Sequence, residues 1–473
     1  MQAVWQNRVK AAVQRRITAH TLAAFNTNVD VVVHLDQAKL EPLASHPRID
    51  FPAVERLLGE EIPAVHNGNE FLAVLMQALQ EGKSVHIVLR DLDMLSWLEE
   101  VFPERVESMG GQAGIIANQM AALGAHSLVY TSLLSKKQAS MFFPEVDVPV
   151  VRDGQLAIVN VQEAVRPQDQ IKENWIFEYA KDERFELGGH VIVTPRANRV
   201  ILATRPAGVK MAFDPQIEEL LPELGRTVDV AFLAGYHYAP TEEKELAAYL
   251  ESAMGSVRKL KAHNPKLRLH FEYVPMTAEE AEKTMLKAVA GEMHSFGINE
   301  NEIKRVLRAF GYEHEREAID SNECSYTLYD GTLRLMEELG FSRIQLHNLG
   351  YYVVLLKKPY DVSWEHVRQS CLYASSVNAM KAKYGGYVLQ ERLAEAGEIP
   401  LSSIGFRQLE MFAEEMRRRG VQVPQNFLEE GILELADHAV LIIPAHVVPD
   451  PVSTVGMGDT ISSSAYAYEH SGC

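Results

Sequence analysis

The chain has few cysteines and fewer bases than acids. Three cysteines, Cys324, Cys371 and Cys473, occur in 473 residues. Their odd number and wide spacing exclude a disulfide framework and a CxxC zinc site, so a reducing cytoplasm is the expected location. Sixty-four acids against 46 lysines and arginines give a net charge of -18. That balance argues against a nucleic-acid partner, and any anionic ligand must be held by local bases.

Long apolar runs are also missing. Residues 1–20 mix charged with apolar side chains, which predicts a capping helix and neither a signal peptide nor a membrane span. No membrane partner is therefore expected. Hydrophobic residues make up 47% and charged residues 23% of the chain, the balance of an ordinary globular protein. At this length we expect one large domain and one smaller domain.

Helical and strand patterns alternate along the chain. In NEFLAVLMQALQEGK (69–83), the spacing of Leu72, Leu75, Met76 and Leu79 predicts a helix that stops at Gly82. We expect one isolated helix in the segment 21–105. From about residue 225 to the end, short apolar runs separated by helices predict a parallel sheet between two helix layers. Alternating strands dominate 151–210 and predict a separate sheet, and TLAAFNTNVDVVVHL (21–35) has the pattern of one further strand. We therefore expect an α/β fold whose large domain comprises 1–20, 106–150 and 211–473, with a discontinuous lid domain from 21–105 and 151–210.

Two common phosphate-binding motifs are absent. Neither GxxxxGK[ST] nor an early GxGxxG is found, and the second absence argues against an NAD-dependent dehydrogenase. The stretch DPVSTVGMGDTISSSAYAYE (450–469) instead places Gly456, Met457 and Gly458 before a predicted helix, where converging amides and the helix dipole suit an anion. Asp459 in this turn is a candidate proton acceptor. The alternative is that Asp459 is only the N-cap of the helix.

Six segments together resemble one enzyme family. FNTNVD (25–30), GGQAGIIAN (110–118), PRANR (195–199), HFE (270–272), GINENE (297–302) and GMGD (456–459) resemble, in the same order, the archaeal ADP-dependent glucokinases and phosphofructokinases of the ribokinase superfamily. The resemblance spans nearly the whole chain. It implies a ribokinase-like three-layer α/β/α large domain under a β-rich lid. The implied reaction transfers the β-phosphoryl group of ADP to a sugar and releases AMP; the glycine turn alone would serve any nucleoside polyphosphate.

The resemblance implies roles for residues at the reaction centre. Asp459 is the implied base, and the amides around Gly456, Met457 and Gly458 would stabilise the moving phosphoryl charge. Glu272, Glu302 and Asn299 resemble the residues of the family's Mg²⁺ site, and hard carboxylates suit that ion. The alternative for these acids is a solvated strand or helix end.

The resemblance also implies substrate-binding residues. Asn26, Asn28 and Asp30 alternate along a predicted strand and so share one face. With the segment that contains Gly110, Gly111 and Gln112, they would line the sugar pocket; a solvent-exposed polar face is the alternative.

A second group is expected to bind the nucleotide. Arg196 and Arg199 flank Asn198 and are equal candidates for its phosphates, the alternative being a surface ion pair. His347, Tyr352, Val447 and Val448 are candidates for the adenine site, although a core strand explains them nearly as well.

The acceptor sugar is the harder choice. Fructose 6-phosphate requires cations near the sugar pocket, and Lys172, Arg199 and Arg205 are the candidates. Val88 stands where glucokinase-like members of the family carry an acid, which favours fructose 6-phosphate as the acceptor and fructose 1,6-bisphosphate as the product. Glucose, alone or as a second substrate, remains the alternative. A non-catalytic sugar or nucleotide binder is more remote because it would not need Asp459. The sequence sets no oligomeric state.

Overall fold

The computed structural model describes residues 1–206, 209, 211–452 and 455–472, and its strands form two main sheets. The larger sheet has eleven strands, which are, in spatial order, β18 (Ile432–Glu434), β19 (His438–Pro444), β17 (Tyr351–Lys357), β16 (Arg343–Asn348), β15 (Ser295–Asn299), β14 (Arg268–Glu272), β13 (Val230–Leu233), β1 (Thr21–Ala24), β6 (Ser127–Tyr130), β7 (Val146–Arg152) and β8 (Gln155–Asn160). The strands from β16 through β13 and β1 to β7 are mutually parallel.

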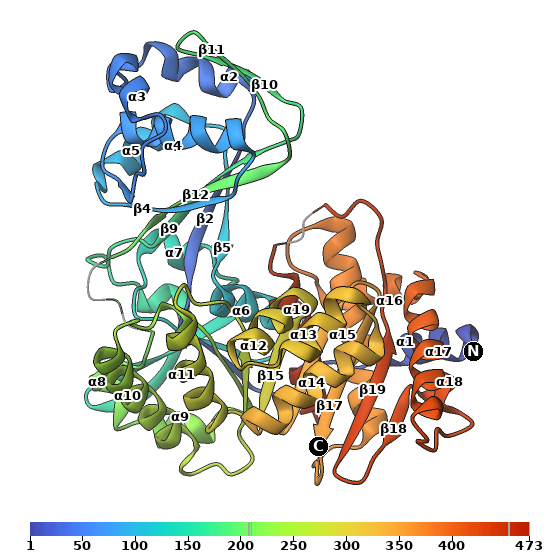
Figure 1. Ribbon diagram of the computed structural model, residues 1–473. Coiled ribbons are helices and arrows are strands. Elements are labelled where there is room, and N and C mark those ends of the chain that lie inside the picture. Colours follow the sequence, from blue (N-terminus) through green and yellow to red (C-terminus); the bar gives the residue numbers. More distant parts are fainter. Residues whose placement is uncertain (207–208, 210, 453–454, 473) are drawn as a thin grey trace.

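The second sheet stands above the first in Figure 1. Its six strands are, in spatial order, β3 (Ala64–Val65), β4 (Val85–Leu89), β12 (Asn198–Thr204), β9 (Glu173–Tyr179), β2 (Asn28–His34) and β5 (Val106–Gly110). A separate hairpin pairs β10 (Arg184–Leu187) with β11 (His190–Val193). Each main sheet has its own hydrophobic core of buried residues.

Helices accompany both sheets. Those that follow the small sheet's strands are α2 (Gln37–Leu40), α3 (Phe51–Leu57), α4 (Gly68–Glu81) and α5 (Asp93–Val101). The others are α1 (Gln2–Ala12), α6 (Gln112–Ala122), α7 (Lys136–Ser140), α8 (Pro215–Glu218), α9 (Leu221–Arg226), α10 (Glu243–Lys261), α11 (Glu279–Ala290), α12 (Glu300–Ala309), α13 (Glu313–Ser321), α14 (Ser325–Leu339), α15 (Trp364–Tyr384), α16 (Leu393–Ala396), α17 (Ser403–Arg418), α18 (Phe427–Glu430) and α19 (Met457–Glu469).

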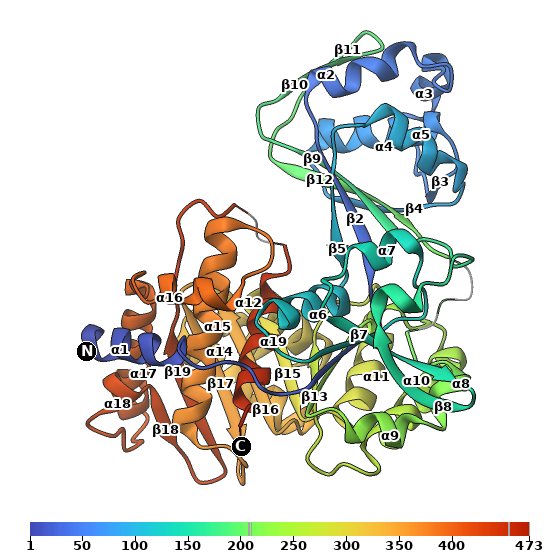
Figure 2. The ribbon, with the colours of Figure 1, turned by 180° about the vertical axis from the view of Figure 1, so that it is seen from behind.

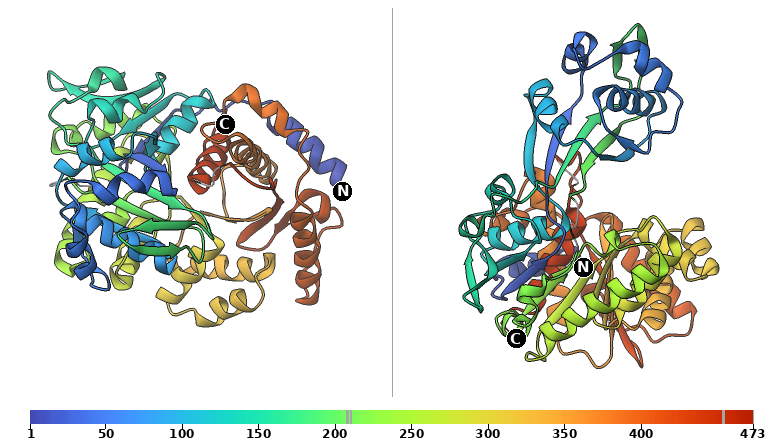
Figure 3. Two further views of the ribbon diagram at one scale, coloured as in Figure 1. Left: turned by 90° about the horizontal axis from the view of Figure 1, so that it is seen from above. Right: turned by 90° about the vertical axis from the view of Figure 1, so that its left-hand side faces the viewer.

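The helices of the larger sheet form a layer on each of its faces. Helices α10, α11, α12 and α14 lie on the face turned to the viewer in Figure 1, and α6, α15 and α19 pack together on the other face (Figure 2). Both chain ends belong to this larger body (Figure 3). The predicted α/β/α layering is therefore confirmed. Within the described residues, no helix is both long and apolar enough to span a membrane.

Several local predictions agree with the structure. The N-terminal helix is α1, and the helix predicted within 69–83 is α4, which ends at Glu81 as expected. Gly82 ends α4 in a left-handed conformation with φ 61°, which glycine adopts without strain. The apolar runs expected to be buried on both faces include β13 and β19, whose residues are all buried.

The structure differs from the expected parallel sheet near the end of the chain. β17 is antiparallel to β16, and β19 is antiparallel to β17. A tight turn at Leu349 and Gly350 joins β16 to β17 directly, and Gly350 has φ 83°. A hairpin therefore replaces a helical crossover, because glycine allows the reversal within two residues. The expectation of one isolated helix in 21–105 was also wrong, since this segment carries α2 to α5.

Three strands lie in a different sheet from the one that the expected domain boundaries assign to them. β1 and β8 were expected in the lid but lie in the larger sheet, whereas β5 was expected in the large domain but lies in the smaller sheet. The apolar run from residue 21 to 35 is two strands, because β1 pairs with β6 and β13 while β2 pairs with β5 and β9. Alternation of apolar residues identifies strands but not their partners. The division into two domains remains a prediction.

A buried ion pair joins β16 to the last residue of α19. Arg343 Nε donates to Glu469 Oε2 over 2.9 Å, and both side chains are fully buried. The Tyr360 hydroxyl donates to Glu469 Oε1 over 2.5 Å. Arg343 also donates to Ser295 Oγ over 3.2 Å and to Gln345 Oε1 over 2.6 Å. The charge pair is therefore held by several hydrogen bonds in the core.

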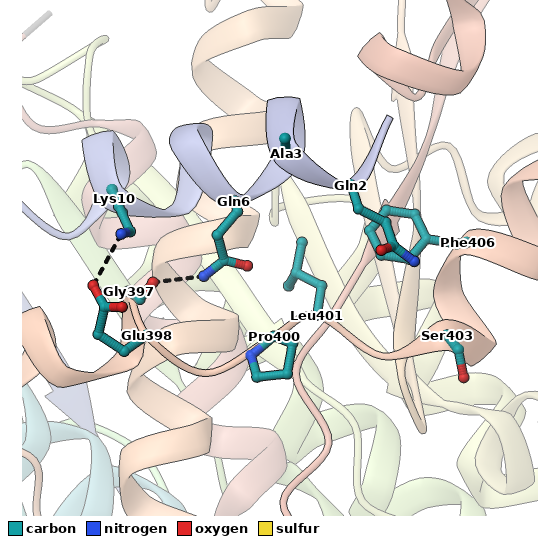
Figure 4. A pocket seen from close by; sticks show the side chains of 10 residues that line it. All are labelled: Gln2, Ala3, Gln6, Lys10, Gly397, Glu398, Pro400, Leu401, Ser403 and Phe406. Atoms are coloured by element: carbon teal, nitrogen blue, oxygen red, sulfur yellow. Dashed lines mark hydrogen bonds and ion pairs between the residues drawn. The ribbon is translucent and has the colours of Figure 1, made fainter.

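The ion pair between Lys10 and Glu398 lies at the surface, in contrast to the buried Arg343–Glu469 pair. Helix α1 lies along residues 397–406, where Lys10 Nζ approaches Glu398 Oε1 at 2.9 Å and Gln6 donates to Gly397 O over 2.6 Å (Figure 4). The Glu398 side chain is 79% exposed. A cavity of about 400 Å³ lies between these segments and is lined by none of the predicted site residues.

We predict that Glu469→Gln lowers the free energy of unfolding by about 3–5 kcal/mol, because it leaves the Arg343 guanidinium buried without its counter-charge. Urea unfolding followed by circular dichroism measures the change. Glu398→Gln is the matched control and should change stability by less than about 0.5 kcal/mol, since it removes one partner of an exposed pair. Equal losses in the two variants would contradict the assigned role of the buried pair.

Candidate active site

The carboxyl ends of β14, β15 and β16 meet at one edge of the larger sheet. These strands are parallel neighbours. β14 ends at Glu272 and β15 at Asn299, and His347 is the last residue but one of β16. The start of α19 reaches the same edge, because a Cβ built on Gly458 would lie 3.1 Å from His347 Nε2 and 3.2 Å from Glu272 Oε1. The structure therefore brings the glycine turn together with Glu272 and His347.

Asp459 lies in the first turn of α19. Gly456 is the N-cap, with φ 66°, and Asp459 is the third residue of the helix, so it is not the N-cap. The first hydrogen bond of the helix runs from Thr460 N to Gly456 O over 3.0 Å. The preceding amides of residues 457–459 have no carbonyl to bind within the helix and lie at its positive dipole end. This arrangement presents amide donors and a carboxylate at one helix end.

Three carboxyl groups influence one another at this edge. Burial and the Glu272 charge raise the pKa of Asp459 to about 7. Burial, together with the charges of Glu272 and Asp459, raises the pKa of Glu302 to about 8. Burial would also raise the pKa of Glu272, but a hydrogen bond from His270 and the nearby His347 hold it below its usual value. The edge therefore carries concentrated negative charge, which favours a cationic ligand.

Glu272 is held by a line of buried polar side chains. Glu272 Oε2 lies 3.1 Å from His270 Nε2, and His270 Nδ1 lies 2.8 Å from Ser295 Oγ. Ser295 in turn accepts from Arg343, which is paired with Glu469. This line joins the edge of the sheet to the far end of α19. It fixes the orientation of the Glu272 carboxylate.

Asn299 and Glu302 form a capping box at the start of α12. Asn299 Oδ1 accepts from Glu302 N over 2.9 Å, and Asn299 N donates to Glu302 Oε2 over 3.0 Å. Their spacing in the sequence therefore has a structural use as well as the predicted metal role. In the described part of the chain, no three His, Cys, Asp or Glu side chains are close enough together to hold a metal ion directly.

The predicted sugar-binding residues lie where the chain crosses between the sheets. The first crossing runs from β1 through Asn26 to β2, and the chain returns through β5 and Gly111 into α6. Asn28 in β2 lies opposite Gly110 in β5. A Cβ on Gly110 would lie 2.3 Å from the Asp30 carboxylate, so the absence of a side chain makes room for Asp30. Asn28 and Asn174 donate to Asp30 Oδ1 over 2.6 and 3.2 Å.

Two cations lie at the other crossings. Lys172 Nζ donates to Asn26 Oδ1 over 2.6 Å and lies 4.7 Å from the ring centre of Tyr238, and the Arg205 guanidinium lies 5.0 Å from the same ring. Burial and the Arg205 charge lower the pKa of Lys172 to about 7. Among the described residues, neither cation has a carboxylate within 4.0 Å. This region is suited to an anionic ligand.

The arginines of the PRANR segment have separate surroundings. Arg196 Nε and Asn198 Nδ2 both donate to Gly82 O, over 2.6 and 2.9 Å. They therefore cap the end of α4, in the upper part of Figure 1, away from α19. Arg199 is exposed in β12, and its charge acts on Asp30. The proposed contact of these residues with nucleotide phosphates stays a prediction.

Only some of the remaining candidates lie near the glycine turn. Gln112 begins α6 and donates to Glu272 O over 3.3 Å, and it lies beside Asp459. Tyr352 is 2% exposed within β17 and belongs to the core. Val447 and Val448 are half-buried just after β19. Of the adenine candidates, His347 thus has the most direct link to the turn.

Sequence reasoning missed several residues that face these groups. Asn174 donates to Asp30, and the Tyr238 ring is in contact with both Lys172 and Arg205. Lys381 in α15 is 5% exposed, and its charge acts on Asp459. The run YHY at 236–238 after a predicted strand was a signal for the aromatic contact. No comparable signal marked Lys381, because a lysine near a helix end is usually solvated.

The chain matches a known family over nearly its whole length. Residues 19–468 match the family described as "ADP-specific Phosphofructokinase/Glucokinase conserved region". The ADP-specific phosphofructokinase of Methanosarcina acetivorans is 32% identical over 455 residues, which cover 94% of this chain and 91% of that protein.

Solved structures of similar proteins agree closely with this fold. The last common ancestor of ADP-dependent phosphofructokinases from Methanosarcinales is 31% identical, with a TM-score of 0.88 and 99% coverage of both chains. An ADP-dependent kinase in complex with fructose-6-phosphate and ADPbetaS is 32% identical, with a TM-score of 0.80 and 98% coverage of both chains.

We predict that Asp30→Asn stabilises the ligand-free protein increasingly as the pH rises. Burial raises the pKa of Asp30 from 3.8 to about 6, so the folded state holds the proton more tightly than the unfolded chain does. Ionisation therefore costs stability from about pH 4 upward, and the full cost is reached above about pH 6. Relative to wild type, the variant should gain about 3 kcal/mol at about pH 8 and little near pH 4. Thermal unfolding across this range measures the difference.

Asp36→Asn is the matched control for this measurement. Hydrogen bonds from Lys39 lower the pKa of Asp36, so this exposed group is ionised in both states above about pH 5. Its effect on the unfolding temperature should be independent of pH from about 5 to 8. A similarly flat difference for Asp30→Asn would disprove the assigned cost.

Proposed function

Because the chain belongs to the ADP-specific phosphofructokinase/glucokinase family, we propose that it transfers the β-phosphoryl group of ADP to fructose 6-phosphate, giving fructose 1,6-bisphosphate and AMP. The observation that carries this proposal is Asp459 in the first turn of α19, beside the amides of the glycine turn. A carboxylate next to an anion-binding turn is suited to removing a proton from a hydroxyl while the amides bind phosphoryl oxygens.

The acceptor follows from the cations between the sheets. Lys172 and Arg205 both lie beside the Tyr238 ring and have no carboxylate within 4.0 Å in the described chain, and they would bind the 6-phosphate. Asn26, Asn28 and Asp30 would bind sugar hydroxyls, with Gly110, Gly111 and Gln112 completing the pocket. Glucose has no phosphate with which to balance the two cations, so it is the less favoured acceptor. The related kinase bound to fructose-6-phosphate and ADPbetaS supports the same choice.

The reaction is an in-line displacement at phosphorus. The carbon-1 hydroxyl of fructose 6-phosphate gives its proton to Asp459 as its oxygen bonds to the β-phosphorus. The bond from this phosphorus to the bridging oxygen breaks, and AMP leaves with that oxygen. The pKa of Asp459, raised to about 7 by burial and Glu272, suits a base that works near neutral pH. The backbone amides of residues 457–459 would donate hydrogen bonds to the phosphoryl oxygens and so stabilise their negative charge.

We also propose a Mg²⁺ site at the acidic edge of the sheet. Glu272 and Glu302 would hold the ion, with Asn299 positioning Glu302, and most contacts would pass through water because no three acidic or histidine ligands of the described chain converge. The residues fit the ion, since burial and the charges of Glu272 and Asp459 raise the pKa of Glu302, and a bound cation would favour its ionised form. When bound, Mg²⁺ would neutralise phosphate charge.

The nucleotide and the cell compartment complete the proposal. Arg196, Asn198 and Arg199 are proposed to contact nucleotide phosphates, and His347, Tyr352, Val447 and Val448 to lie at the adenine. The enzyme is proposed to work in the cytoplasm, consistent with the buried free thiols of Cys324 and Cys371; Cys473 lies outside the described residues. Monomer and dimer remain alternatives.

The proposed reaction is tested by its products. Purified protein with Mg²⁺ and fructose 6-phosphate should form AMP and fructose 1,6-bisphosphate in equal amounts from ADP and far less from ATP. Chromatography of the nucleotides and coupled detection of the sugar product measure both. Replacing fructose 6-phosphate with glucose should reduce AMP formation at least about tenfold, because Lys172 and Arg205 lose their anionic partner. Preference for glucose would select the glucokinase alternative, and no AMP with either sugar would reject the kinase.

We predict that Asp459→Asn reduces kcat about a hundredfold or more while the Kd for AMP changes less than about threefold, because only the proton acceptor is removed. Steady-state kinetics and calorimetry measure the two quantities. Asp450→Asn, an exposed aspartate shortly before the turn, is the control and should keep nearly full activity. An active Asp459→Asn variant would show that another group accepts the proton.

A further inference from the structure

Lys381 is a buried cation near the end of α15. Its side chain is 5% exposed, and Nζ donates to Gly386 O over 3.1 Å and lies 5.4 Å from the ring centre of Tyr387. In the described part of the chain, no carboxylate lies within 4.0 Å of Nζ. Lys381 donates this one hydrogen bond, which leaves two of its three ammonium donors for other partners. A buried cation with no carboxylate in contact with it is costly unless a ligand supplies one more negative group.

The end of α15 lies against the segment that leads into the glycine turn. Val452 N donates to Ala382 O over 2.8 Å, and a Cβ on Gly385 would lie 3.2 Å from Val452 Cγ1. Helix α15 also packs along α19 (Figure 2). Lys381 is therefore carried on the element that borders the turn where Asp459 lies.

The electrostatics of the turn agree with this placement. Burial lowers the pKa of Lys381, and the negative charge of Asp459 opposes that shift. Lys381 is likewise the cation that lowers the pKa of Asp459, against burial and Glu272. Glu272, Glu302 and Asp459 give this edge an excess of negative charge, so a polyphosphate would be repelled unless cations face it. Lys381 supplies such a charge from the side of α15.

We infer that Lys381 donates a hydrogen bond to the β-phosphoryl group of ADP, the group that is transferred. This inference rests on the proposed function and adds a residue to its site. A lysine in this position attracts the phosphoryl oxygens in the ground state and in the transition state, and it partly screens Asp459 from their charge. AMP lacks the β-phosphoryl group, so Lys381 should discriminate ADP from AMP.

A purely structural role makes a different prediction. If Lys381 only holds Gly386 and Tyr387 at the end of α15, its loss disturbs the turn for every nucleotide. AMP and ADP binding would then weaken together. The ratio of the two dissociation constants thus separates a phosphoryl contact from a helix-end contact.

The test compares Lys381→Met, Lys381→Arg and wild type by calorimetric titration with ADP and with AMP, in the presence of Mg²⁺ and without sugar. Lys381→Met should weaken ADP binding about tenfold or more and AMP binding less than about twofold, since one charge-assisted hydrogen bond to the β-phosphoryl group is lost. Its kcat/KM for ADP should fall at least about tenfold. Lys381→Arg keeps the charge and should recover part of the ADP affinity.

Lys383→Met is the matched control. Lys383 belongs to the same helix turn, but its side chain is 43% exposed and its partner is Glu395. This variant should bind both nucleotides as wild type does. Equal weakening of ADP and AMP by Lys381→Met, or no weakening of either, would overturn the inference. Failure of wild type to convert ADP to AMP would instead reject the proposed function, so the two failures are distinguishable.

Discussion

Like charges gathered at one edge of the parallel sheet constrain the rest of this molecule. Parallel strands end on the same side, and β14, α12 (which follows β15) and α19 bring Glu272, Glu302 and Asp459 within electrostatic reach of one another. Their repulsion is visible in the pKa of Glu302, which burial and these neighbours raise to about 8. Such an arrangement costs stability in the ligand-free protein, as expected for groups arranged for binding or chemistry rather than for packing.

The protein limits this cost by fixing one of the acids firmly. His270, Ser295 and Arg343 join Glu272 to Glu469 through hydrogen bonds in the core. The two ends of α19 are therefore tied to the same sheet, one by the glycine turn beside Glu272 and the other by the Arg343 pair. A carboxylate held in this way needs little rearrangement when a cation arrives, which is the physical meaning of a preorganised site.

Much of the fold could be predicted from the sequence, because buried parallel strands are short apolar runs and helices carry their own periodicity. Pairing could not be predicted: residues 21–35 read as one strand but serve two sheets, and Gly350 turns a predicted crossover into a hairpin. These outcomes depend on partners distant in the chain, which local patterns do not encode.

The candidate site was predictable where a motif depends on backbone geometry. Gly456 and Asp459 lie at a helix start, as the glycine spacing indicated. Long side chains were harder, because their ends are placed by tertiary packing: Arg196 caps α4 through Gly82, and Lys381 is buried where a solvated lysine would be expected. The roles of the individual site residues remain predictions.

The first crossing between the sheets has a consequence for how such a molecule is assembled. Ala113 N donates to Asn26 O over 3.0 Å. The point where the chain leaves the larger body for the smaller sheet is therefore hydrogen-bonded to the point where it returns. An excursion with adjoining ends adds no strain to the framework that it leaves. The segment that carries β2 to β5 can therefore change in length without shifting the register of the larger sheet.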